Sequence, residues 1–265
     1  MCHKNTPIIR SNIFIPIQVG RANANVILED MIGDDTGDNI STKNPNYCEL
    51  TAQYWAWKNL NAEYIGLNHY RRLFNFHKGA YGKSYFQQFN EKTKREYGWD
   101  DTNIYEICNG YDVITLPPDK LKLTVYEHYK THHRENDLNV AMTVLSEKFP
   151  EMHEIAHNVI VSGNKMRFNN MILMKKHIFD SYSAWLFDIL FEVENRIEIS
   201  KDPQEARVFG YLAERLLNVY VEYILKSEKI QYKELEWVFG DYDDLVRRKW
   251  FKKMKSFIKH RFVFN

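Results

Sequence analysis

Short apolar segments alternate with amphipathic helical patterns along this chain, and this alternation limits its fold more than any other feature. Four apolar segments have the length and composition of buried strands: residues 13–19, 64–67, 112–116 and 171–174. Helical periodicity marks residues 48–60, 178–193 and 208–224. Strands that alternate with helices predict a layered α/β domain.

Length, charge and cysteine usage narrow the class of protein. A chain of 265 residues is long enough to bury a large hydrophobic core, so it does not need disulfide bonds for stability. Its 36 basic and 35 acidic residues nearly cancel, which argues against a nucleic-acid-binding protein. The three cysteines lack metal-ligand spacing and indicate a reducing compartment. No apolar run reaches the ~18 residues of a membrane span and no secretory signal is recognisable, so the expected location is cytoplasmic.

Residues 245–265 differ in charge from the rest of the chain. They hold eight Lys or Arg and no acidic residue, which leaves 28 basic against 35 acidic residues in positions 1–244. Apolar residues recur in this tail at helical spacing, so the sequence predicts one domain over 1–244 followed by a basic amphipathic helix. Either the helix lies on the anionic inner face of the cell membrane, or it docks on the domain with its lysines in solvent.

Polar residues follow the apolar segment 64–67 directly, in the sequence YIGLNHYRRLF. Ligands of open α/β sheets bind beyond the carboxyl ends of the strands, so His69, Arg71 and Arg72 are candidate site residues. Arginine binds phosphate oxygens in bidentate fashion. In extended backbone the two arginines point to opposite faces, so one of them can meet a ligand while the other pairs with an acid. Two structural ion pairs are the alternative.

Two further polar segments have less specific patterns. Residues 32–41, IGDDTGDNIS, form either a ligand-binding loop or a solvated turn. Residues 128–137 form either a wet polar loop or part of a metal site, since His128 and His132 would share one face of a helix. Asp100 and Asp101 are a weaker metal candidate. The chain has no G-x-x-x-x-G-K-[ST], G-x-G-x-x-G, G-x-S-x-G or H-E-x-x-H motif.

Several long blocks of the sequence resemble one known family. The blocks are IPIQVG, IGDDTGDNISTKNPNYCELTAQYWAWKN, EYIGLNHYRRLF, NNMILMKKHIFDSYSAWLFDILFEVENRI and ARVFGYLAERLLNVY. They are similar to the DUF4422 family of bacterial capsular and exopolysaccharide glycosyltransferases, some of which resemble β-galactofuranosyltransferases. The resemblance implies a GT-A-like fold, with a Rossmann-type mixed sheet flanked by helices.

The chain departs from the family pattern in two places. Members usually begin with a strand that leads into a T-H-K segment, whereas this chain opens with MCHK, so we expect that strand to be missing or shortened. The chain also has no plain Asp-x-Asp at the place where many GT-A enzymes hold Mn²⁺ or Mg²⁺, and the segment YIGL ends instead in NHYRR. We therefore expect Arg71 or Arg72 to supply part of the positive charge that a metal would bring.

The resemblance also implies an activity. It is the transfer of a hexose, expected to be galactofuranose, from a UDP-sugar to a growing lipid-linked surface polysaccharide, with inversion. The alternatives are a GT-A enzyme that uses UDP-galactopyranose or UDP-glucose, and a non-catalytic carbohydrate-binding or assembly factor.

Candidate residues for this activity follow from their places in the chain. The catalytic candidates are Arg71 and Arg72 for the diphosphate, and Asp137 or Glu214 for the base. Donor-binding candidates are Gln18, Gly20, Asp34, Asp38, Asn39, His69 and Asn170. Supporting candidates are Glu49, Tyr54, Lys58 and Arg207, and weak metal candidates are His69, Asp100, Asp101 and His132. Glu214 has an alternative role as the buried partner of Arg207 or Arg215.

Overall fold

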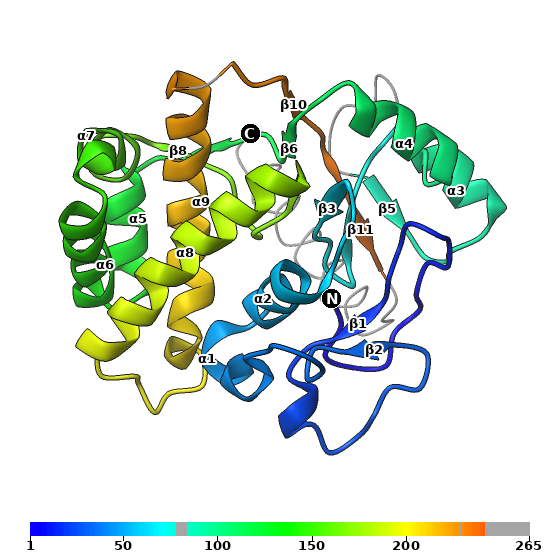
Figure 1. Cartoon of the computed structure of the whole chain (residues 1–265), viewed down its shortest axis with the longest axis horizontal. Helices are drawn as coiled ribbons and strands as arrows, with labels where there is room; N and C mark the ends of the chain where they lie inside the picture. Colours follow the sequence, from blue (N-terminus) through cyan, green and yellow to red (C-terminus); the bar gives the residue numbers. More distant parts are fainter. Residues whose placement is uncertain (78–83, 228, 242–265) are drawn as a thin grey trace, which may run out of the picture.

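The computed structural model describes residues 1–77, 84–227 and 229–241 (Figure 1). The predicted basic helix at 245–265 lies outside these residues. Within them the chain has the mixed α/β architecture expected from its sequence, with two hydrophobic cores on opposite faces of a central sheet. Among the described residues, no helix combines the length and apolar character needed to cross a bilayer. All three cysteines are free.

The central sheet has four strands in the order β10-β6-β9-β3. Their bounds are β3 Tyr64–Gly66, β6 Val113–Thr115, β9 Ile172–Lys175 and β10 Tyr232–Glu234. β9 runs antiparallel to β3 and β6, and β10 runs parallel to β6. Side chains alternate between the faces, so that Val113 enters one core and Ile114 the other. Three of the four strands predicted from apolar segments are these strands.

Helices cover one face of the sheet and form the larger core (Figure 1). They are α1 Asn44–Tyr47, α2 Leu50–Asn59, α5 Val125–His132, α6 Glu135–Lys148, α7 His153–Ala156, α8 Lys176–Arg196 and α9 Val208–Ser227. Single 3-10 turns lie at Arg21–Asn23, Ser41–Lys43, Pro150–Met152 and Glu205–Arg207, and a π-helical turn at His157–Val161. The three helices predicted from periodicity correspond to α2, α8 and α9.

A smaller layer covers the other face. It contains a three-stranded sheet of β4 Arg72–Phe74, β11 Trp237–Gly240 and β5 Ser84–Phe86, with helices α3 Glu91–Tyr97 and α4 Asp101–Asn109. Aromatic rings fill its core, and the indole of the fully buried Trp99 donates to the carbonyl of Phe74 at 2.8 Å. A short ribbon of β7 Asp119–Lys120 and β8 Lys165–Met166 lies beside the central sheet.

The first residues of the chain lie beside β1 (Ile17–Gln18). Cys2 forms an isolated parallel bridge with Gln18 in β1, which pairs with β2 (Ile32–Gly33). The strand expected at 13–19 is wrong at residues 13–16 and at Val19, because β1 contains only Ile17 and Gln18.

The polar segment 128–137 is helical rather than a loop. It contains the end of α5 and the start of α6, and the rings of His128 and His132 stack on one face of α5 with centroids 4.6 Å apart. The wet-loop interpretation is therefore wrong. Asp100 accepts a hydrogen bond from the Asn103 amide as the N-cap of α4.

Asp34 organises the loops that follow β1 and β2. Its buried carboxylate accepts hydrogen bonds from the amides of Gly20 and Arg21 and from the hydroxyls of Ser41 and Thr51. Four donors occupy the two carboxylate oxygens, so this side chain links three separate segments.

We expect Asp34→Ala to lower the free energy of unfolding by about 2–4 kcal/mol, because four donors would lose their acceptor in a buried place. Urea denaturation measures the change. Asp38→Ala is the matched control, since Asp38 is exposed, and we expect it to cost less than about 1 kcal/mol. Equal effects of the two substitutions would contradict the structural role of Asp34.

Candidate functional site

One edge of the central sheet gathers most of the polar candidates. β3 and β6 end at this edge and β9 begins there, because β9 is antiparallel to both. His69 follows β3, Asn169 and Asn170 precede β9, and residues 116–119 follow β6. β10 runs parallel to β6 and brings residues 236–237 to the same edge. Ligands of open α/β sheets bind at such an edge.

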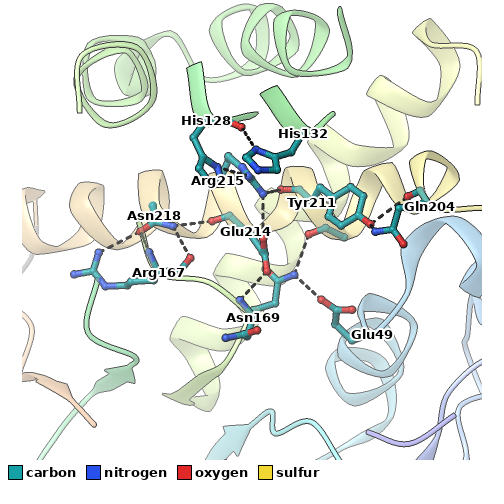
Figure 2. Close-up of polar contacts among 12 residues, drawn as sticks. Glu49, His128, His132, Arg167, Asn169, Gln204, Tyr211, Glu214, Arg215 and Asn218 are labelled. Atoms are coloured by element: carbon teal, nitrogen blue, oxygen red, sulfur yellow. Dashed lines mark hydrogen bonds and ion pairs between the residues drawn. The ribbon is translucent and has the colours of Figure 1, made fainter. Parts of the chain in front are cut away.

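Glu214 is the carboxylate at the centre of this site (Figure 2). It lies on α9, where its Oε1 accepts a 2.7 Å hydrogen bond from the Asn169 amide and its Oε2 lies 3.0 Å from the Arg215 guanidinium. Burial raises the pKa of Glu214 to about 7, against the lowering effect of Arg215. The sequence left Arg207 and Arg215 as alternative partners, and the structure pairs Glu214 with Arg215.

The backbone around Glu214 is strained. Cys48, Asn169 and Asn170 are the three non-glycine residues with positive φ among those described, at 53°, 74° and 48°. The side-chain amide of Asn170 donates at 2.8 Å to Glu49, the residue that follows Cys48. Such conformations cost of order 1–3 kcal/mol each and cluster at functional sites. The side-chain oxygen Oδ1 of Asn170 is buried without a hydrogen-bond partner among the described residues.

His69 ties the β3 side of the site to the Asn169 turn. Its Nε2 lies 2.5 Å from the Asn169 carbonyl oxygen, which can only accept, so Nε2 carries the proton. Burial lowers the pKa of His69, while the charge of Glu49 opposes this effect. A neutral His69 therefore holds the loop that positions Glu214.

Arginine side chains border the site. The Arg72 guanidinium packs on the rings of Trp237 and Phe239, 5.6 Å and 5.9 Å from their centroids, and Arg71 packs on Tyr70 at 5.1 Å. Burial lowers the pKa of Arg72, and the charges of Tyr70, Glu214 and Glu49 oppose that shift.

The basic border continues around the N-terminus and α9. Burial lowers the pKa of His3, as do the nearby charges of Lys4, Arg207 and Arg71. Arg207 donates to Cys48 Sγ at 3.3 Å. Positive charges from three segments of the chain thus lie together around His3, and Arg207 among them also interacts with Glu49.

A polar cavity of about 220 Å³ adjoins the cluster. Its lining includes Asp119, Phe168, Asn169, Glu236 and Trp237. Asn169 connects this cavity to His69 and Glu214, and Trp237 connects it to Arg72. Aromatic faces beside carboxylates suit a sugar ring, which has apolar faces and hydroxyl edges.

The opposite flank of Glu214 is built by α5 and α9. The Arg215 guanidinium lies 5.0 Å from the ring of Tyr129 and within 3.5 Å of His128 Nδ1. The rings of His133 and Tyr211 stack with centroids 4.0 Å apart. These contacts fix Arg215, which is itself only 1% exposed.

The other donor-binding candidates lie apart from Glu214 in hydrogen-bonded positions of their own. Gln18 bonds to Val26 and Leu28, and Gly20 has a φ of 65° and donates to Asp34. Asn39 bonds to Gly37 and Ser41. Their roles in donor binding stay predictions.

Two supporting candidates lie along α2, which Glu49 precedes directly. Tyr54 donates to Asp38 at 3.1 Å, and Lys58 stacks over Trp57. Asp137 is buried at the start of α6, where burial raises its pKa and its Oδ1 lacks a hydrogen-bond partner. The charges of Arg134 and Glu205 act on Asp137, the first lowering its pKa and the second raising it.

The weak metal candidates do not converge. Asp100 caps α4, Asp101 accepts from the Asn12 amide, and His132 bonds to backbone within α5. Within the described parts of the chain, no three His, Cys, Asp or Glu side chains come together as metal ligands. This donor set does not fit a metal held by the protein alone.

Sequence reasoning missed Asn169 and the polar cavity, and it named Arg215 only as a possible partner of Glu214. The Asn169-Asn170 pair could have indicated a turn with positive φ, since asparagine adopts such backbone angles more readily than most residues. The cavity could not be found in this way, because its walls come from segments 50 to 120 residues apart in the chain.

Comparison with solved structures identifies the fold as that of a glycosyltransferase. The chain is similar to the "WbbM bifunctional glycosytransferase apo structure", with a TM-score of 0.85 and 33% identity over 91% of this chain and 44% of that chain. The chain thus spans less than half of that protein.

Residues 1–259 match the family described as "Domain of unknown function (DUF4422)", and the chain belongs to this family. The family and fold implied by the sequence blocks are therefore confirmed. No curated protein matches the chain.

The raised pKa of Glu214 predicts a pH-dependent stability. Because this carboxyl group binds its proton more tightly in the folded state, its ionisation destabilises the protein as pH rises from about 4.5 to about 7. We expect wild type to lose about 3 kcal/mol relative to Glu214→Gln between pH 4 and pH 8. Denaturation of both proteins across this range measures the difference, and parallel pH profiles would contradict it.

Proposed function

We propose that this protein transfers a hexose from a UDP-sugar to a saccharide acceptor, with Glu214 as the base and Arg71 and Arg72 at the diphosphate. The observation that carries the proposal is the proximity of a carboxyl group with a pKa near 7 to arginine side chains at the ligand-binding edge of the sheet. The glycosyltransferase fold supports the same reaction class.

The leaving group requires positive charge. As the bond between the anomeric carbon and the diphosphate breaks, negative charge grows on the UDP oxygens. Arg72 is half-buried on Trp237 and Phe239, so its charge is less screened than that of an exposed arginine. Arg71, Arg207 and Lys4 extend the positive region, which can supply part of the charge that a metal would otherwise bring.

The acceptor requires a base. The acceptor oxygen forms a bond to the anomeric carbon while the bond to UDP breaks, and the hydroxyl proton passes to Glu214. A carboxylate with a pKa near 7 accepts this proton more readily than one with an ordinary pKa. Direct displacement of this kind inverts the anomeric centre. Asp137 is the second candidate, and it is favoured less because the charges that act on it are those of Arg134 and Glu205, whereas Glu214 interacts with the Asn169 turn and with Arg72.

The 220 Å³ cavity is suited to a neutral sugar ring. Phe168 and Trp237 offer apolar faces, and Asp119 and Glu236 can accept hydrogen bonds from hydroxyl groups. Two carboxylates there would repel a diphosphate, so we assign this cavity to a sugar and the basic border to UDP.

The finer identity of the substrates rests on the family resemblance. We propose UDP-galactofuranose as donor and a lipid-linked polysaccharide at the inner membrane face as acceptor. UDP-galactopyranose or UDP-glucose is the alternative donor, and a carbohydrate-binding assembly factor is the alternative without catalysis. Release of UDP, measured with a panel of UDP-sugars, separates these three outcomes.

We expect Arg72→Ala to slow transfer by roughly 30-fold to 1000-fold, because a charge preorganised at the leaving group is lost. Single-turnover release of UDP from the active donor measures the effect. Arg10→Ala is the matched control, since Arg10 forms an ion pair with Asp30 that leaves its side chain 67% exposed. Unchanged transfer by folded Arg72→Ala protein would reject the diphosphate role.

We expect Trp237→Ala to weaken saccharide binding by about 5-fold to 100-fold, through the loss of ring stacking. The Kd of the accepted sugar measures this effect, and Phe239→Ala is the matched control, since Phe239 also packs against Arg72 but is not part of the cavity lining. An equal loss of saccharide affinity in both variants would contradict the assignment of the cavity to a sugar.

A further inference from the structure

The polar cavity of about 220 Å³ contains two carboxylates that differ from the other acids nearby. Asp119 of β7 and Glu236, which follows β10, both line it. In the described part of the chain, neither carboxylate forms an ion pair or a side-chain hydrogen bond. Glu234 lies on the same segment as Glu236 and is paired, 3.1 Å from the Arg167 guanidinium. The cavity therefore keeps two negative charges that have no ion-pair partner among the described residues.

The polar side chains of the lining are mainly hydrogen-bond acceptors. An ionised carboxylate can only accept, so it pairs with a sugar hydroxyl that donates. Asn169 adds its side-chain amide, since its backbone N–H and carbonyl are already bonded to Glu214 and His69. Phe168 and Trp237 supply apolar faces. This lining matches an uncharged ring with hydroxyl groups at its edge, whereas a ligand carboxylate would meet two like charges.

Buried contacts fix the backbone around the cavity. The Asn75 amide donates to the Glu236 carbonyl oxygen at 2.8 Å. Arg167, which directly precedes Phe168, donates to Glu234 at 3.1 Å and so ties the Phe168 wall to β10. Its side chain can do this from inside the protein, because Arg167 is only 6% exposed. Walls held in this way are formed before a ligand binds, as a site that discriminates between ligands requires.

The basic border of the site begins at the same wall. Trp237 lines the cavity, and the Arg72 guanidinium packs on its ring, 5.6 Å from the centroid. Trp237 therefore belongs both to the acidic cavity and to the basic border. A nucleotide sugar has the same division of charge, since its uncharged ring is bonded directly to an anionic diphosphate. This arrangement favours the sugar of the donor in the cavity, with its diphosphate at Arg72.

We propose that the cavity binds the sugar ring of the donor, and that Asp119 and Glu236 determine its specificity by admitting uncharged hexoses and excluding hexuronates. The inference rests on the proposed use of a UDP-sugar. In a hexuronate, a carboxylate replaces the C6 hydroxymethyl group, so a hydrogen-bond donor is lost and a like charge is gained. Glu236 is half-buried, so its repulsion is screened less than that of an exposed carboxylate. Unpaired charges that oppose one ligand are a general means of specificity.

The test compares matched donors that differ only at C6. The pairs are UDP-glucose with UDP-glucuronate and UDP-galactose with UDP-galacturonate, and UDP alone is the reference. Isothermal titration calorimetry at low salt measures the Kd of each compound. In the pair that contains the better-bound hexose, we expect wild type to bind the UDP-hexose at least about 10-fold more tightly than the UDP-hexuronate.

The charges are tested by a double variant. Asp119→Asn with Glu236→Gln removes both charges and keeps the size of the side chains. We expect it to bring the two Kd values within about 3-fold of each other, by strengthening the binding of the UDP-hexuronate. Glu106→Gln with Glu154→Gln is the matched control, since it changes the net charge equally at exposed positions outside the cavity lining. We expect the control to keep the wild-type ratio.

Three results would count against the proposal. Equal affinity of wild type for UDP-hexose and UDP-hexuronate would overturn it, and would leave the proposed function intact if UDP still binds. An equal loss of discrimination in the control would show a long-range effect of net charge and would also overturn it. Absence of binding by UDP and by every UDP-sugar would reject the proposed function and this inference with it.

Discussion

The turn at Asn169 and Asn170 holds the candidate site together. Both residues have positive φ, which directs the chain into β9 between two strands of opposite direction. In the same turn, the backbone amide of Asn169 donates to Glu214 and its carbonyl accepts from His69. The side-chain amide of Asn170 donates to Glu49. Elements from four parts of the sequence therefore depend on two strained residues, as expected where structure is maintained for function.

Burial and charge act in opposite directions within this cluster. Desolvation raises the pKa of Glu214 and lowers those of His69 and Arg72, so it favours the neutral form of each group. The opposite charges nearby favour the ionised form of each group, so they offset part of these pKa shifts. The proposed transfer of a sugar to a hydroxyl group rests on this arrangement, a carboxyl group with a pKa raised to about 7 near arginine side chains.

The sequence predicted much of the fold because buried strands and packed helices leave local patterns. YIGL, DVITL and MILM are apolar runs on the central sheet, and the periodicities of α8 and α9 follow their buried faces. The site was harder to predict. The segment around Asp34 has the composition of a ligand-binding loop. The hydrogen bonds that Asp34 accepts from Ser41 and Thr51 come from other elements, so this buried network depends on tertiary contacts that the sequence does not show. The strand at 13–19 was overestimated because an apolar run does not show whether a neighbouring strand exists.

Residues 232–240 take part in both sheets within a single short segment. β10 extends the central sheet, and β11, which begins five residues after the first residue of β10, pairs with β4 and β5 in the smaller sheet. Between them lie Leu235 in the aromatic core and Glu236 in the polar cavity. A protease that cut this connection would sever the covalent link between the two sheets and leave β11, the middle strand of the smaller sheet, on a separate fragment, so we expect the smaller layer to lose its integrity first.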